Sequence, residues 1–163
     1  MKKYFAIISI ITACFFATGF TFMSQPTDDN VAFPEGYREW THIKSSVTGP
    51  QSPGFQANGG FHHIYANEKA MQGYSTGKFP EGSILVFDVI EVNEKNGNFS
   101  QGKRVRVDVM MKDSIKYSST GGWGYDEFKE SSKTERILTS AARTACFNCH
   151  SSQKDYIFSE FAQ

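Results

Sequence analysis

A Cys-x-x-Cys-His pattern close to the carboxyl end restricts the folds that this 163-residue chain can adopt. Cys146 and Cys149 are followed directly by His150, and only 13 residues come after it. This spacing is typical of covalent haem attachment, because a helical turn brings both sulfurs to one edge of the porphyrin while the imidazole points at the iron. A small electron carrier with an early motif takes a methionine ligand from the segment that follows, but residues 151–163 contain no methionine. That topology is therefore excluded.

Two other uses of the cysteine pair are open. A structural zinc site needs two further Cys or His ligands, and no paired ligand motif accompanies His42, His62 or His63. A redox Cys-x-x-Cys normally follows a strand in a thioredoxin-like βαβ pattern, which the sequence lacks. We therefore expect one covalent haem c per chain, with zinc or a redox dithiol as the alternatives.

The amino-terminal segment is typical of an export leader. Two lysines precede an apolar run over residues 4–23, and residues 24–32 form a polar linker. Cleavage of residues 1–23 is the favoured outcome, and lipidation of Cys14 or an uncleaved membrane anchor are the alternatives. In each case we expect the domain over residues 33–163 to face an oxidising space, periplasmic or otherwise exported.

Charge excludes one class of partner. The chain has 17 basic and 17 acidic residues, and the basic ones are scattered. A nucleic-acid-binding domain shows a basic patch or stripe instead. We therefore expect no nucleic-acid partner.

Strand-like segments dominate the domain. Residues 83–92 are rich in β-branched and aromatic side chains, and in residues 104–112 two arginines and an aspartate alternate with three valines. With a turn over residues 93–98, the two segments predict a hairpin. Residues 117–128 add a glycine-rich turn and a further strand, whereas residues 45–60 are dense in Gly, Pro and Ser and predict a long loop.

Two short helices complete the expected fold. Residues 60–67 predict a strand, after which Asn67 can cap a helix that begins at Glu68. Residues 139–150 are the best helix former in the domain and carry the cysteines. We expect a mainly β (α+β) fold, an antiparallel sheet with short helices and with the haem-attachment motif on a C-terminal helix.

With these features in place, the chain resembles the cytochrome P-460 family, and is closest in kind to its beta-type cytochrome c-prime members. The resemblance covers about residues 33–160. The haem motif is the specific part, and the other segments are persuasive as an ordered series. The matching segments are "FPEGYREW", "HHIYANEKAM", "GKFPEGSILVFDV", "VDVMMKDS", "GGWGYDEF" and "CFNCHSSQKDYIFS".

The resemblance implies a homodimer of antiparallel β subunits, each with one haem c whose proximal ligand is His150. Hydroxylamine-oxidising members carry a cross-linking lysine where this chain has Phe87. Members with an apolar residue there bind nitric oxide or carbon monoxide. His62 and Asp108 match distal polar positions of the family, although an exposed strand histidine and a solvent-facing aspartate are the alternatives.

The resemblance therefore favours an exported mono-haem cytochrome that binds small diatomic ligands at an open distal site. One alternative is an enzyme, a hydroxylamine or nitric oxide oxidoreductase, and another is a periplasmic electron carrier with a redox partner protein. Whether the protein is an enzyme is open, and gas binding is favoured. Three methionines, Met71, Met110 and Met111, are possible iron ligands, but core filling explains them better.

Overall fold

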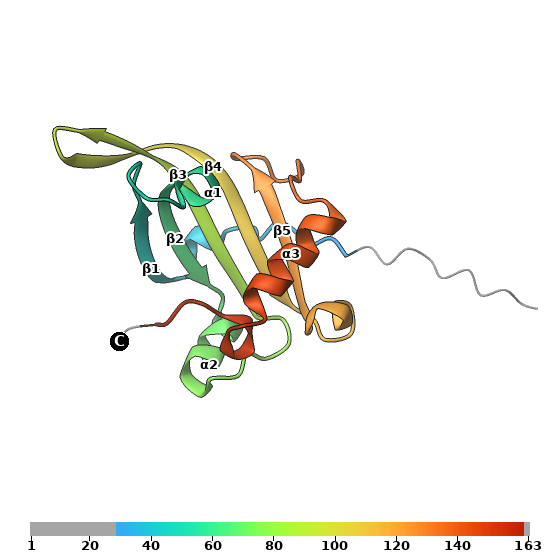
Figure 1. Ribbon diagram of the computed structural model, residues 1–163. Helices are drawn as coiled ribbons and strands as arrows, with labels where there is room; N and C mark the ends of the chain where they lie inside the picture. The colour runs from blue at the N-terminus through green and yellow to red at the C-terminus, as the bar shows by residue number, and fades with distance from the viewer. Residues whose placement is uncertain (1–28, 162–163) are drawn as a thin grey trace, which may run out of the picture.

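Five strands form one antiparallel sheet in which every strand pairs with its neighbours in sequence, in the order β1-β2-β3-β4-β5 (Figure 1). The computed structural model describes residues 29–161, so the expected leader and Cys14 lie outside the described residues. The strands are β1 (Thr41–Thr48), β2 (Gly60–Ala66), β3 (Ile84–Lys95), β4 (Asn98–Lys112) and β5 (Trp123–Lys129). The expected mainly β fold with an antiparallel sheet is confirmed.

The helices are short and lie between or after the strands. They are α1 (Phe55–Asn58), α2 (Glu68–Thr76) and α3 (Ser140–His150), with 3-10 turns η1 (Tyr37–Glu39), η2 (Ser118–Thr120) and η3 (Lys154–Tyr156). As expected, the Asn67 side chain caps α2 by accepting a hydrogen bond from the Ala70 N–H at 2.9 Å, and α3 holds both cysteines. Among residues 29–161, no helix is both long enough and apolar enough to span a bilayer.

The two faces of the sheet are covered by different parts of the chain (Figure 1). One, which we call the N-terminal face, packs against residues 29–40. The other, the α3 face, packs against α2, α3 and the C-terminal segment. The folded core extends into the last residues of the expected linker, because Val31 is 0% exposed. Alternate residues of each strand point to opposite faces, so the register decides which side chains share a site.

A fully buried carboxylate anchors the N-terminal face. Asp88 on β3 accepts hydrogen bonds from the Tyr37 hydroxyl at 2.7 Å, from Arg38 Nη2 at 2.8 Å and from Arg104 Nε at 2.8 Å. Burial opposes ionisation of Asp88, but these donors together outweigh it and lower its pKa. Asp88 therefore ties η1 and β4 to the centre of the sheet.

Three sequence-based expectations about local structure were wrong. The loop expected from residue 45 begins only after β1, and its last part contains α1. The turn expected over residues 93–98 contracts to Asn96 and Gly97, whose φ angles of 55° and 78° suit a two-residue hairpin connection. The alternation across residues 104–112 is broken by a bulge near Val105, so Arg104 reaches Asp88 on the N-terminal face whereas Arg106 does not.

Candidate functional site

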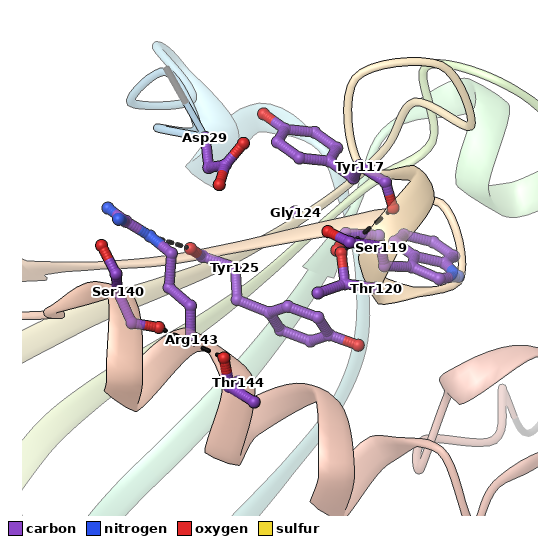
Figure 2. A pocket seen from close by; sticks show the side chains of 10 residues that line it. Asp29, Tyr117, Ser119, Thr120, Gly124, Tyr125, Ser140, Arg143 and Thr144 are labelled. Atoms are coloured by element: carbon purple, nitrogen blue, oxygen red, sulfur yellow. Dashed lines mark hydrogen bonds between the residues drawn. The ribbon is translucent and has the colours of Figure 1, made fainter. Parts of the chain in front are cut away.

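Helix α3 lies against β5 and is fixed there by one arginine. Arg143 donates from Nε to the Tyr125 carbonyl at 3.0 Å, and from Nη2 to Asp126 Oδ2 at 3.2 Å and Asn30 Oδ1 at 2.8 Å. Figure 2 shows the Arg143 side chain reaching from α3 to the backbone of Tyr125. Arg143 also lines a small cavity of about 80 Å³ between β5, α3 and the loop that follows β4. These bonds set the side of α3 that faces the sheet, and Cys146 and Phe147 are packed on that side.

The two cysteines are neighbours on α3 because they are three residues apart on one helix. Cys146 is half-buried, Cys149 is exposed, and neither forms a disulfide. Burial, together with the nearby carboxyl groups of Glu127 and Asp108, raises the pKa of the Cys146 thiol. Within residues 29–161, no three His, Cys, Asp or Glu side chains gather in a way that could hold a metal ion, so the zinc alternative gains no further ligands.

His150, the last residue of α3, is held by a hydrogen bond and two aromatic contacts. Its Nδ1 lies 2.7 Å from the Tyr156 carbonyl oxygen, and a carbonyl can only accept, so Nδ1 carries the proton. The ring packs against Tyr125 and Phe158, with centroid distances of 5.3 Å and 4.9 Å. Burial lowers the pKa of His150. A neutral imidazole whose Nδ1 is engaged offers Nε2 to a metal, which is the usual arrangement of a histidine ligand.

Phe87, His62 and Asp108 lie together on the α3 face. Phe87 on β3 is the direct Cα partner of Asp108 on β4, and its ring centroid lies 4.6 Å from that of His62 on β2. His62 is buried, which lowers its pKa, and its Nδ1 lies 3.5 Å from the Ser46 hydroxyl. The exposed-histidine alternative for His62 is therefore wrong, and the structure brings the three predicted distal residues together.

The surroundings of Asp108 favour the protonated, neutral form of its carboxyl group. Burial raises its pKa to about 7, even though the Arg106 guanidinium, whose Nε is 2.9 Å from Oδ1, opposes the shift. Glu127 on β5 is the Cα partner of Asp108, and burial raises its pKa as well. Carboxyl groups with raised pKa values in one place are a common property of functional sites.

Sequence reasoning missed Arg106 and Glu127. Arg106 bridges Asp108 and α1, where its Nη2 donates to Asn58 Oδ1 at 3.0 Å. Glu127 lies two residues after Tyr125 on β5, so both side chains point to the α3 face. The alternation of Trp123, Tyr125 and Glu127 was visible in the sequence and could have indicated the second carboxyl group.

Two regions thus meet on the α3 face. His150 and Cys146 pack near Tyr125, while Phe87, His62 and Asp108 lie on the neighbouring strands, with Glu127 between the two groups on β5. Three buried polar atoms of this face have no hydrogen-bond partner within the described residues: His62 Nε2, Trp123 Nε1 and Tyr125 Oη. A buried polar atom without a partner is costly unless another group satisfies it. The thiols, the oriented imidazole and these unpartnered atoms together suit a haem.

Comparison with known proteins agrees with this arrangement. A search of curated proteins finds no significant match to the chain. The sequence model of the family described as Cytochrome P460 matches residues 34–159, which is most of the chain and includes both cysteines and His150. The chain therefore belongs to the Cytochrome P460 family, which implies a haem-binding cytochrome.

Proposed function

We propose that this protein is an exported mono-haem c-type cytochrome that binds small neutral diatomic ligands, such as nitric oxide or carbon monoxide. The observation that carries the proposal is the grouping of Phe87, His62 and Asp108 on the sheet face that α3 covers. A bound haem supplies an iron atom that coordinates such ligands. The chain's own residues hold the group, orient the imidazole and determine which ligands enter.

Attachment uses the two thiols of α3. Cys146 and Cys149 would hold the haem through two thioether bonds, each of which would form by addition of one thiol S–H across a vinyl group. No oxidant or reductant is consumed in this addition. His150 is the iron ligand of the proposal, because its Nδ1–H is already engaged by the Tyr156 carbonyl.

The distal residues favour neutral ligands. Phe87 presents an apolar ring, and burial keeps His62 in its neutral form at physiological pH because it lowers the pKa. Asp108, with a pKa of about 7, is protonated in a large fraction of molecules near neutrality. A site with few full charges and a bulky ring disfavours water and charged ligands relative to small neutral molecules.

A hydroxylamine or nitric oxide oxidoreductase is the second candidate. Asp108 and Glu127 are direct cross-strand partners with raised pKa values, and such carboxyl groups can accept protons from a substrate. Against this candidate stands Phe87, which occupies the position where the resemblance expects a cross-linking lysine. An electron carrier is the third candidate, because the unpartnered Nε2 of His62 could serve as a second axial ligand.

The test is expression with a cytochrome c maturation system, followed by haem staining after denaturing electrophoresis. Haem should stay with the chain and be lost when both cysteines are replaced by Ala. The ferrous protein should be high-spin and bind carbon monoxide, and Phe87→Ala should accelerate carbon monoxide binding severalfold. Phe99→Ala, the same change at an exposed position of the projecting β3–β4 hairpin, is the matched control.

Two outcomes would reject gas binding. A six-coordinate, low-spin spectrum that becomes high-spin in His62→Ala would favour the electron carrier. Steady oxidation of hydroxylamine by the wild-type protein with an artificial electron acceptor would favour the enzyme. Unchanged carbon monoxide kinetics in Phe87→Ala would mean that this ring does not guard the ligand site.

We also infer that the protein is a homodimer, a proposal that rests on the family and on the exposed edge of the sheet. Strand β1 ends the sheet, and its Val47 is 45% exposed. An unpaired strand edge is a ready surface for pairing with a second copy. Light scattering at micromolar concentration should give twice the mass of one chain, and a monomer would reject the inference.

A further inference from the structure

The 3-10 turn η3, which begins four residues after the end of α3, has an unusual backbone conformation. Asp155 and Tyr156 have φ angles of 45° and 66°, a left-handed region that residues other than glycine seldom adopt. Two such residues in succession carry a conformational cost that surrounding contacts must offset. The second of them, Tyr156, supplies the carbonyl oxygen that accepts the hydrogen bond from His150 Nδ1.

The side chain of Asp155 holds this turn from two directions. Its Oδ2 accepts a hydrogen bond from the Phe79 N–H at 2.7 Å, which fixes the turn to the segment before β3. Its Oδ1 lies 3.4 Å from Lys112 Nζ, at the end of β4. The Asp155 and Lys112 side chains are only 18% and 12% exposed, so solvent screens their attraction weakly.

The ring of Tyr156 is confined as well. It stacks on Phe147 of α3 with a centroid distance of 5.8 Å, and Lys112 Nζ lies 5.8 Å from its centroid. Its hydroxyl end lies against Gly121, where any side chain would collide with it. With the Tyr156 ring and the Asp155 carboxylate both fixed, the Tyr156 carbonyl has little freedom to turn away from His150, because the N–H of the same peptide unit, that of Ile157, donates to the Lys154 carbonyl at 3.2 Å.

We propose that Asp155 is a positioning residue for the proximal imidazole. Through Phe79 and Lys112 it holds the Asp155–Tyr156 turn in the geometry that presents the Tyr156 carbonyl to His150 Nδ1. This inference rests on the proposed function, in which His150 binds the iron. A strong Nδ1–H hydrogen bond makes the ligating nitrogen more basic and stabilises ferric over ferrous iron.

The test uses the haem-loaded full chain and two variants. Asp155→Ala removes both anchors, whereas Asp155→Asn keeps an oxygen acceptor for the Phe79 N–H and removes only the charge facing Lys112. Asp113→Ala is the matched control, since Asp113 also accepts backbone hydrogen bonds in a turn, from Ile115 and Lys116. The measurements are the reduction potential and the iron–imidazole stretching band of the ferrous protein in resonance Raman spectra.

We expect Asp155→Ala to shift the ferric–ferrous equilibrium about tenfold toward ferrous, which is about 59 mV for one electron. The iron–imidazole band should move to lower frequency. Asp155→Asn should change both in the same direction by a smaller amount, and Asp113→Ala should leave both unchanged. A loss of stability in Asp155→Ala with an unchanged potential and band would overturn the proposal, and so would an equal shift in the control. If Asp155→Ala does not fold, an unshifted Asp155→Asn has the same meaning.

A haem-free measurement separates this inference from the proposed function. Nitrogen-15 NMR of the haem-free full chain should show His150 protonated at Nδ1 in the wild type and a mixture of tautomers in Asp155→Ala. Identical tautomer populations would overturn the role of Asp155 even if haem binding is as proposed. A wild-type chain that fails to attach haem, but whose tautomer shifts in the variant, would overturn the proposed function and support the role of Asp155.

Discussion

The two faces of the sheet treat buried polar groups in opposite ways. On the N-terminal face, Asp88 is 0% exposed and is surrounded by donors that lower its pKa. On the α3 face, Asp108 has Arg106 beside it, yet burial still raises its pKa to about 7. Adjacent residues of one strand, such as Phe87 and Asp88, thus lie in different environments because their side chains point to opposite faces of the sheet.

The hydroxyl groups of the two faces follow the same division. Tyr37 on the N-terminal face donates to Asp88 at 2.7 Å, while the Tyr125 hydroxyl on the α3 face has no hydrogen-bond partner within the described residues. Fully satisfied polar groups stabilise a fold, whereas unpartnered ones are tolerated where another group is to be bound. The comparison indicates that the N-terminal face maintains the structure, and it supports the proposal that the α3 face binds the haem.

The largest effect should come from removing the buried charge of the N-terminal face. Asp88→Asn leaves Arg104 without its carboxylate in a buried place, so we expect the free energy of unfolding to fall by about 3 kcal/mol at pH 7. Urea unfolding followed by circular dichroism measures this change. A loss below about 1 kcal/mol would break the comparison, because Asp88 would then resemble an ordinary surface carboxylate.

The corresponding substitution on the α3 face, Asp108→Asn, should raise the free energy of unfolding, and the size of this effect should depend on pH. The pKa of Asp108 is higher in the folded state than the unfolded value of about 3.9, so the folded state binds more protons between these values. The wild type should therefore lose stability as the pH rises from 4 to 8, by about 2 kcal/mol once partial solvent access is allowed for, and Asp108→Asn should lack this loss.

Unfolding free energies of both proteins across this pH range test the prediction. Glu39→Gln, a neutralised carboxyl group at an exposed position, controls for the general effect of removing a negative charge. If the unfolding free energies of wild type and Asp108→Asn change in parallel with pH, the ionised carboxyl group of Asp108 is stabilised by its neighbours as well as that of Asp88 is.

The smallest expected effect is the difference between removing the hydroxyl group of Tyr37 and removing that of Tyr125. Tyr37→Phe removes a hydrogen bond to a buried carboxylate and should cost about 1.5 kcal/mol. Tyr125→Phe removes a hydroxyl that has no protein partner, so the haem-free chain should change by less than about 0.5 kcal/mol. Thermal unfolding of the haem-free variants measures both, and equal losses would mean that Tyr125 is a structural residue like Tyr37.

Much of the fold followed from local patterns. The Asn67 cap of α2, the composition of α3 and the β-branched runs of β3 and β4 predicted these elements because each has a strong intrinsic preference. Strand β1 was missed because it is an edge strand with little burial, so its residues show no alternation. The bulge near Val105 was missed because one inserted residue changes the face of Arg104 without leaving a mark in the local composition.

The candidate site was predictable only where one short segment carries it. Cys146, Cys149 and His150 lie within five successive positions of α3, so spacing alone predicted their role in haem attachment. The grouping of Phe87, His62 and Asp108 required the family resemblance, because they lie on three strands and meet only through the strand register. Arg106, Glu127 and Asp155 have partners that no local pattern specifies, and the turn at Asp155 is fixed by Phe79 and Lys112, far away in the sequence.

The strand order also implies an order of assembly. Each strand pairs with the next along the chain, and β3 and β4 are joined by only two residues, so the sheet can form through short loop closures that cost little entropy. The first described residues cannot dock until β5 is in place, because the Val31 N–H bonds to Asp126 and Asn30 bonds to Arg143 of α3. We therefore expect the first described residues, from Asp29 onward, and α3 to dock last and together. The segment with the two thiols would then stay accessible on a preformed sheet until the final step of folding.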